Sequence, residues 1–369
     1  MSINNYQIYI DCGFSKFRAS AFHKTDLKKT WHIESKFLFD HKEIGEEAKK
    51  IVTFLEKNTN EYINDINLMI DSPKMISIGI SIFKKTDGLQ LKPEDIQFLV
   101  QETKQQISKY YKKQNIIHII INNYKINDID YDYFPSNIKC NSIALDIIFV
   151  CLPKEIIKYF KNIFYKFDIS VNQIICSSYA KAKNHEENLP SYQNISFIDI
   201  GYNKTSITSY INKKIYCLSV LPIGGNHITK DISKMLKINL VEAENIKINF
   251  DKKENFLNNQ DFSLELLQKI ILARTDEIIN MCAHSIKLSS ITMNNFKVVL
   301  MGEGARILNN HYKNKISIEH DLDFLEKTSK EVCRDGFILG MGLNRHEVTI
   351  VPKKQQKKGF FEKFFHFFN

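Results

Sequence analysis

Two segments far apart in the chain each place a carboxylate and a glycine directly after an apolar stretch. Asp11 ends the first stretch and Asp199 ends the second, and Gly13 and Gly201 follow two residues later in each case. The residues after each glycine favour a returning strand, so each acid is expected at the tip of a β-hairpin. Two such hairpins, one in each half of the chain, are typical of two related lobes that face a nucleotide in the cleft between them. The alternative is a pair of ordinary hairpins in mixed sheets.

Glycines before helices indicate a second kind of chemistry. Gly224 and Gly225 precede a stretch with helical character, and such a pair leaves backbone N–H groups open to an anion because no Cβ blocks close approach. Gly302 and Gly304 follow an apolar strand, and the turn they form would let the backbone approach a flat ring closely. A strand followed by Gly-x-Gly and a helix occurs in many α/β folds, so this last pattern is weak alone.

Strands and helices alternate along the chain and must position these residues. Period-two apolar patterns predict strands, and apolar residues at helical spacing predict helices. The predicted strands are 6–11, 17–24, 66–71, 75–83, 116–122, 143–152, 169–173, 197–201, 205–210 and 296–301, with a further short pair before residue 221. The predicted helices include 43–57, 92–111, 153–167, 175–182, 264–289 and 337–343. The last of these is rich in small residues and is expected to close the second lobe.

The stretch 75–168 has a pattern of its own. Its order of β-α-β-β-α could form a small α+β subdomain inserted into the first lobe, and its residues include no metal-binding or catalytic cluster. We therefore expect it to contact another protein. The alternative is a scaffold insert without a partner.

Bulk properties limit the class of protein. A chain of 369 residues with 43% hydrophobic and 25% charged residues predicts a folded protein of two or more domains. The net charge of +9 indicates either an anionic partner or a solvated basic surface. Seven scattered cysteines without a Cys-x-x-Cys pair predict reduced thiols and argue against zinc. No basic-then-apolar leader and no run of 18 apolar residues occurs, so we expect a cytoplasmic protein that contacts any membrane from its surface.

The C-terminus carries a basic linker and then a stripe of phenylalanines. At helical spacing the six rings fall within roughly 160° of one face, with Glu362, Lys363 and His366 opposite. This pattern predicts an amphipathic helix in the membrane interface, with lysines that favour anionic lipid; the alternative is docking on the protein's own core or on a partner groove. Because one short helix binds lipid weakly, the tail also indicates self-assembly. The predicted membrane contacts are Phe360, Phe361, Phe364, Phe365, Phe367, Phe368, Lys357, Lys358 and Lys363.

The order of these features resembles the FtsA family of actin-like cell-division proteins. The matching features are the hairpin at Asp11, the insert, the hairpin at Asp199, the Gly-Gly-x-x-Ile-Thr-x-Asp helix, Ala-Glu-x-x-Lys at 243–247, the glycine turn at 302 and the amphipathic tail. The resemblance implies an α/β, actin-like (ribonuclease H-like) two-lobed fold with an inserted α+β subdomain of the SHS2 type and a C-terminal amphipathic helix.

The resemblance also implies domain boundaries. The first lobe core would comprise 1–74 and 169–194, with the insert at 75–168. The second lobe core would comprise 195–226 and 297–345, with a lower subdomain at 227–296 that binds the FtsZ tail. A linker at 346–358 and the membrane helix at 359–369 complete the chain.

By the same resemblance, ATP with Mg²⁺ would bind between the lobes. Gly13, Ser15 and Lys16 would lie at the first phosphate loop, and Asp199, Gly201, Lys204 and Thr205 at the second. Gly224 and Gly225 would line the phosphate side, Glu244 and Lys247 would contact ribose, and Gly302, Glu303, Gly304 and Ala305 would face adenine. Asp11 and Asp199 would hold the metal through water, since hard cations prefer oxygen ligands.

The implied partners are those of a membrane tether for FtsZ filaments. Arg274 would contribute to the surface that binds the C-terminal tail of FtsZ, because its charge suits an acidic peptide; an internal ion pair with Glu277 is the alternative. The other expected partners are further copies of the chain in a filament, anionic lipids, and later division proteins bound through the insert, with no nucleic acid. The expected place is the cytoplasmic side of the inner membrane at the septum.

The sequence departs from the family's phosphate loops. Tyr202, Asn203, Lys204 and Ser206 stand where the second loop usually has glycines, a threonine and a final acid. Phe14 replaces a small hydroxyl residue, and Glu303 replaces a glycine. We therefore expect nucleotide binding with slow or absent hydrolysis. The alternatives are an actin-fold ATPase or kinase, which would need an acid near the γ-phosphate, and a pilus-assembly scaffold of the PilM type, which would not need its own lipid anchor.

Overall fold

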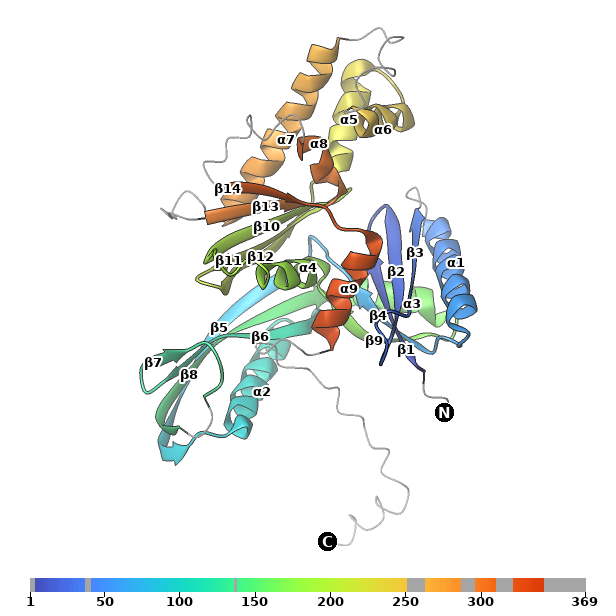
Figure 1. Ribbon diagram of the computed structural model, residues 1–369. Helices are drawn as coiled ribbons and strands as arrows, with labels where there is room; N and C mark the ends of the chain where they lie inside the picture. The colour runs from blue at the N-terminus through green and yellow to red at the C-terminus, as the bar shows by residue number, and fades with distance from the viewer. Residues whose placement is uncertain are drawn as a thin grey trace.

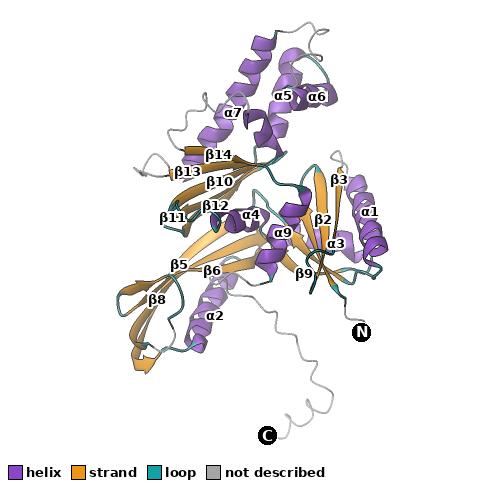
Figure 2. Ribbon diagram, in the orientation of Figure 1, coloured by secondary structure: helices purple, strands orange, loops and turns teal. Residues whose placement is uncertain are grey.

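The computed structural model describes residues 4–36, 41–135, 138–250, 263–286, 296–309 and 321–341, and their strands form three sheets (Figures 1 and 2). The first sheet contains β1 (Tyr6–Cys12), β2 (Lys16–His23), β3 (Thr30–Lys36), β4 (Asp65–Met69) and β9 (Ser170–Ile175). The second contains β10 (Asn194–Ile200), β11 (Thr205–Ile211), β12 (Lys214–Leu221), β13 (Phe296–Met301) and β14 (Asp321–Leu325). The third contains β5 (Ile76–Gln90), β6 (Gln114–Ile126), β7 (Ile129–Tyr131) and β8 (Lys139–Pro153).

The first two sheets repeat one topology. Their strand orders are β3-β2-β1-β4-β9 and β12-β11-β10-β13-β14, so the same sequential pattern occurs twice. In each, the first three strands form an antiparallel meander and the last two join in parallel. The predicted duplicated hairpins thus belong to a duplicated sheet. One strand, β12, takes the place of the short pair predicted before residue 221, and β3 and β14 were not predicted.

Helices connect and cover the sheets. They are α1 (His41–Thr59), α2 (Pro93–Tyr110), α3 (Lys154–Tyr165), α4 (Ser177–Glu186), α5 (Gly225–Leu236), α6 (Leu240–Asn249), α7 (Leu264–Ile286), α8 (Arg306–Asn309) and α9 (Ser329–Gly340), with a 3₁₀ turn η2 (Glu303–Ala305). Figure 1 shows α1 and α9 on opposite sides of β2, and α7 and α4 on opposite sides of the second sheet. None of the described helices has the length and apolar character needed to span a membrane.

Local sequence explains several helix starts. Pro93 opens α2, where its missing N–H costs no hydrogen bond because the first N–H groups of a helix have no partner within the helix. Glu94 and Asp95 follow in the first turn, where negative charge interacts favourably with the helix dipole. The hydroxyl of Thr328 accepts from the backbone N–H of Glu331, whose carboxylate in turn accepts from the N–H of Thr328. This reciprocal cap fixes the start of α9.

The position of α9 corrects one prediction. The apolar segment at 337–343 was expected to close the second lobe, but α9 packs on β1, β2 and β3 of the first sheet and on α4. Phe337 stacks on Phe22 with ring centroids 4.7 Å apart. A Cβ at Gly336 would approach Met69 to 2.4 Å, and one at Gly340 would approach the Tyr9 hydroxyl to 2.4 Å. The small residues therefore let the helix lie close to the first sheet, so the chain returns to the first lobe after the second.

The third sheet forms the inserted unit. Helix α2 buries Ile96, Leu99, Val100 and Ile107 against it, and these side chains belong to a core separate from those of the other two sheets. The insert also touches the second sheet at its edge strand β12, where Asn122 exchanges two hydrogen bonds with the backbone of Ile215 at 2.8 and 2.9 Å. The exact boundaries of the subdomains stay a prediction, and the predicted linker and membrane helix at 346–369 lie outside the described residues.

Candidate functional site

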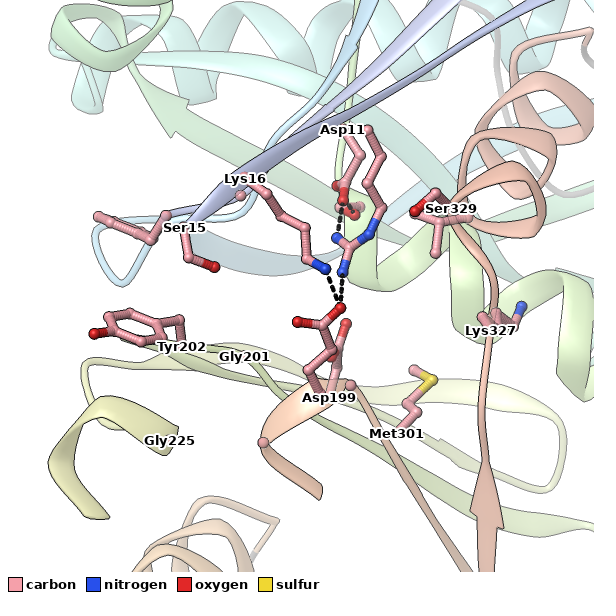
Figure 3. Close-up of a pocket in the computed structure, with 18 of the residues that line it drawn as sticks. Asp11, Ser15, Lys16, Asp199, Gly201, Tyr202, Gly225, Met301, Lys327 and Ser329 are labelled. Carbon is pink, nitrogen blue, oxygen red and sulfur yellow. Dashed lines mark hydrogen bonds and ion pairs between the residues drawn. The ribbon is translucent and has the colours of Figure 1, made fainter. Parts of the chain in front are cut away.

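A cavity of about 590 Å³ lies where the first and second sheets face each other. Its walls come from the β1–β2 and β10–β11 turns, the start of α5, α6, and the turn after β13 (Figure 3). The predicted site residues that line it are Asp11, Gly13, Ser15, Lys16, Asp199, Gly201, Lys204, Gly225, Glu244, Lys247, Gly302, Glu303 and Gly304. Segments nearly 300 residues apart in sequence thus meet in one place.

The two hairpin turns share a sequence pattern that extends beyond the acid and the glycine. Residues 11–16 read Asp-Cys-Gly-Phe-Ser-Lys and residues 199–204 read Asp-Ile-Gly-Tyr-Asn-Lys, so both follow Asp-x-Gly-aromatic-x-Lys. In both, the backbone N–H of the glycine donates to the carbonyl of the lysine, at 3.0 Å in the first loop and 2.9 Å in the second. The acid therefore stands before the turn and the lysine after it, on both sides of the cavity.

Each loop lysine reaches the opposite lobe. Lys204 donates to the backbone carbonyl of Asp71 at 2.6 Å and lies 5.2 Å from the centre of the Phe14 ring. Lys16 pairs with Glu34 of its own sheet at 2.9 Å and with Glu303 of the second lobe. The two lobes are therefore joined across the cavity by both cations.

Asp11 is a buried acid that is already neutralised. Arg18, its directly opposite residue on β2, donates to Oδ2 at 2.8 Å, and the Ser177 hydroxyl donates to Oδ1 at 2.6 Å. Burial alone would raise the pKa of Asp11, but the charges of Lys181 and Arg18 and the Ser177 hydrogen bond outweigh it and lower the pKa to about 2. Asp11 is thus a carboxylate held by cations of the chain itself.

Asp199 is neutralised from another element. Lys181, on α4, donates to its Oδ2 at 2.6 Å, and both side chains are about nine-tenths buried. Burial disfavours the charged lysine, but Asp199 and Asp11 raise the pKa of Lys181 above its ordinary value, so the ammonium is retained. The other oxygen, Oδ1, lies so close to Gly302 that a Cβ there would approach it to 2.3 Å.

A third buried acid, Asp71, is satisfied by hydrogen bonds. It accepts from the backbone N–H of Ser178 at 3.1 Å and from the Ser206 hydroxyl at 2.9 Å. Ser206 stands directly opposite Asp199 on β11, and its hydroxyl bonds to Asp71 of the first lobe. None of Arg18, Lys181 and Asp71 was among the predicted site residues, although the register of the first hairpin alone places Arg18 opposite Asp11.

These contacts do not fit the predicted magnesium site. A divalent cation bound by Asp11 and Asp199, directly or through water, needs their negative charge. Arg18 and Lys181 already pair with those carboxylates and together supply two positive charges beside them. Among the described residues, no group of three or more His, Cys, Asp or Glu side chains is placed to hold a metal ion.

The glycine turn before α5 is required by close backbone contact. A Cβ at Gly224 would lie 2.5 Å from the carbonyl oxygen of Gly201 and 2.8 Å from that of Tyr202. The N–H groups of Gly225 and Asn226 donate to those same two carbonyls, at 2.9 and 2.7 Å. The turn therefore braces the second loop. It does not present these two N–H groups to an anion, contrary to the expectation from the glycine pair.

The predicted ribose contacts lie together on the cavity wall. Lys247 pairs with Glu244 at 2.7 Å and donates to the hydroxyl of Thr229 at 2.7 Å. Burial lowers the pKa of Lys247, although Glu244 opposes this. The centre of the Tyr202 ring lies 5.7 Å from the Lys247 ammonium. Burial, and to a smaller extent the negative charge of Glu244, raises the pKa of Tyr202 to about 12.

Three predicted site residues do not line the cavity. Gly224 lies behind the second loop, as described above. Thr205 is buried, and its hydroxyl donates to the carbonyl of Ile223 at 2.7 Å, away from the opposite lobe. Ala305 belongs to the core of the second lobe. All three pack or bond within the second lobe, and their direct contact with a cofactor stays a prediction.

Arg274, the predicted partner-binding residue, lies on α7 far from the cavity. Its guanidinium pairs with Glu277, as the sequence spacing suggested, and also with Asp231 of α5, where Nη2 donates to Oδ1 at 3.0 Å. The hydrogen bonds from Arg274 to Asp231 raise the pKa of Arg274, and this effect outweighs burial, which lowers it. The second acid was not predicted, because it comes from a different helix.

Comparisons with known proteins connect this geometry to a family. The model of the family "Cell division protein FtsA" matches residues 196–269, which include the second loop, α5 and α6. FtsA of Buchnera aphidicola subsp. Baizongia pistaciae is 27% identical over 284 residues, covering 71% of this chain and 65% of that protein. FtsA of Neisseria meningitidis is 41% identical over 85 residues, covering 23% of this chain and 20% of that protein.

This chain is similar to FtsA.

The solved structure of a PilM–PilN type IV pilus biogenesis complex shares the fold, with a TM-score of 0.61 over 92% of this chain and 98% of that one. At 12% sequence identity, this likeness shows the fold alone. The predicted actin-like α/β fold is therefore confirmed, and the FtsA matches support an actin-like protein of the cell-division type. The chain spans less than two thirds of the length of the curated FtsA relatives it first matches.

Proposed function

We propose that this chain is a self-assembling, nucleotide-binding adaptor of cell division that links FtsZ filaments to the cytoplasmic membrane. The observation that carries the proposal is the pair of Asp-x-Gly-aromatic-x-Lys loops that face one cavity between two sheets of the same strand order. The similarity to FtsA supports the cell-division part.

ATP is the proposed ligand of the cavity. Its phosphates would lie between Lys16 and Lys204, its ribose near Glu244 and Lys247, and its adenine at the turn of Gly302. Lysine ammonium groups bind phosphate as point charges. The cavity volume of about 590 Å³ falls in the range of pockets that hold small molecules.

We expect hydrolysis to be slow or absent. Hydrolysis needs a polar side chain near the γ-phosphate, such as a carboxylate, that orients the attacking water or accepts its proton. Asp11 and Asp199 pair with Arg18 and Lys181, and Ser206 stands where the family has a further acid. The cavity therefore suits a nucleotide-dependent switch in assembly better than an ATPase or kinase.

The surface formed by α5, α6 and α7 is the proposed site for the acidic tail of FtsZ. Lys230 and Lys234 are exposed one turn apart on α5, beside exposed Met235. Arg274 lies on the neighbouring α7, where Asp231 fixes its orientation. A cationic surface with apolar groups between the charges suits a short acidic peptide with hydrophobic anchors.

The C-terminal segment is the proposed lipid anchor. Residues 359–369 would insert the phenylalanine face into anionic lipid, and filament formation would add the weak affinities of many copies. We further propose that later division proteins bind the insert, and that the chain works at the septum on the cytoplasmic face of the membrane.

Co-sedimentation with anionic vesicles and FtsZ, with and without ATP, tests the proposal. The full chain should carry FtsZ into the vesicle pellet, and a variant lacking residues 359–369 should not. The truncated chain should still bind the FtsZ tail peptide in solution, which shows that its body is folded. Equal pelleting of the truncated and full chains would contradict the tether.

A further inference from the structure

The acids that could recruit a metal to the cavity are all engaged by groups of the chain. Asp11 pairs with Arg18, Asp199 with Lys181, and Asp71 with serine hydroxyl and backbone donors. The arginine and lysine are largely buried, so their charges are only weakly screened by solvent. Their two positive charges equal the charge of one divalent cation and lie beside the two acids that the sequence predicted as its ligands.

Two cations of the cavity, Lys16 beside Glu34 and Arg18 beside Asp11, have a further partner that an anion can replace. Lys16 and Arg18 both contact the carboxylate of Glu303, Arg18 through Nη2 at 3.5 Å. The Glu303 side chain is 48% exposed, whereas that of Lys16 is only 6% exposed. Because the Glu303 carboxylate is about half exposed, it can turn into solvent at little desolvation cost, provided that another anion takes its place beside the buried cations. The two buried cations would then be open to a more highly charged group.

Glu303 belongs to the 3₁₀ turn that follows β13 and lines the cavity. Its carboxylate comes from the second lobe, and both cations come from β2 of the first lobe. These ion pairs therefore join the two lobes, as an anion bound between Lys16, Arg18 and the second lobe would. A phosphate carries more negative charge and more acceptor oxygens than a carboxylate, so it should displace Glu303.

We propose that this cavity binds the polyphosphate of a nucleotide without a divalent cation, and that Glu303 holds the place of a phosphate on Lys16 and Arg18 until the nucleotide binds. This inference rests on the proposed nucleotide-binding function. Arg18 and Lys181 neutralise the acids that would otherwise repel a metal-free polyphosphate. Glu303 competes with the ligand, so its removal should improve binding.

Calorimetric titration of ATP into the full chain, in excess magnesium and in excess EDTA, tests the inference. Affinity in EDTA should equal or exceed that in magnesium, because the free polyphosphate is the species bound. Glu303→Gln should bind ATP about five- to tenfold more tightly than the wild type, since Lys16 and Arg18 lose a competing carboxylate.

Glu326→Gln is the matched control. Glu326 also lies at the cavity, is 58% exposed and pairs with Arg306, so its removal deletes the same charge without freeing Lys16 or Arg18. Its effect should stay below about twofold. Thermal unfolding of both variants checks that they are folded.

The outcomes distinguish a failure of the metal-free inference from a failure of the proposed nucleotide-binding function. ATP binding that weakens tenfold or more in EDTA, or equal gains in both variants, would overturn the inference and leave nucleotide binding standing. ATP binding in neither buffer, with folded protein, would overturn the proposed function together with the inference.

Discussion

The two hairpin loops of the cleft have the same sequence pattern but neutralise their acids from different places. In the first hairpin Arg18 stands directly opposite Asp11 and pairs with it. In the second, Ser206 stands opposite Asp199, and the cation is Lys181 from α4. The first acid therefore has a paired cation within its own hairpin, in addition to Ser177 and Lys181 of α4, whereas the second acid takes its paired cation from α4. One residue, opposite the acid, decides between the two arrangements.

Removing the opposite residue of each hairpin should give the largest contrast. Arg18→Met leaves the buried Asp11 carboxylate without its nearest cation, and we expect a loss of about 3–5 kcal/mol in the free energy of unfolding. Ser206→Ala removes one hydrogen bond to Asp71, and we expect a loss of about 1–2 kcal/mol. Urea denaturation at neutral pH measures both. Similar losses of unfolding free energy in the two variants would contradict the claim that the residue opposite the acid matters more in the first hairpin than in the second.

A second contrast concerns the support behind the second loop. Gly224→Ala would force a methyl group against the carbonyls of Gly201 and Tyr202, and we expect a loss of about 2–3 kcal/mol. Gly45→Ala in α1 is the control, because a Cβ there has no neighbour within 4 Å and alanine favours helix by up to about 1 kcal/mol. If Gly224→Ala unfolds at the wild-type urea concentration, the second loop is not braced by α5.

The pH dependence of stability should report the pairing of Asp11. Its pKa is lowered from 3.8 to about 2 in the folded chain, so its contribution is complete above about pH 4 and is lost as the pH falls toward 2. The shift corresponds to about 2 kcal/mol. We therefore expect Asp11→Asn to be less stable than the wild type by about this amount at neutral pH, with the gap closing between about pH 4 and 2. A gap that stays constant over this range would show that the pairing does not depend on the charge of Asp11.

Much of the fold followed from local patterns. Alternating apolar residues that end in Asp and Gly predicted both hairpins, and β1, β2, β10 and β11 lie close to the predicted ranges. The short strand β14, with acids at 321 and 323, gave too weak a pattern to be predicted. The position of α9 could not be predicted, because a small, apolar helix face shows that something packs closely on it but not which sheet does.

The loop residues of the site could be predicted from the sequence, but the charged residues that pair with the acids could not. Asp11 and Asp199 were predicted from the apolar stretches that precede the glycines, and Lys16 and Lys204 from the resemblance to the FtsA family. Arg18 comes from the same hairpin as Asp11, but the partners of Asp199 and Asp71 come from α4 and from the opposite lobe, so tertiary packing decides whether they reach the acids. Lys181 was the hardest to find, because it lies in the sequence Ser-Ser-Tyr-Ala-Lys-Ala-Lys, where nothing distinguishes it from Lys183 or indicates its buried partner. Arg18 and Lys181 are also the groups whose charges do not fit the predicted magnesium site.

The most direct test of the account is ATP affinity in variants of the two loop lysines. If the nucleotide binds between the loops, Lys16→Met and Lys204→Met should each weaken ATP binding about tenfold, and the double variant about a hundredfold. Titration calorimetry on the folded full chain measures this, with Lys269→Met, an exposed lysine on α7, as the control. A double variant that binds ATP with wild-type affinity would contradict the claim that the paired loops form the nucleotide site.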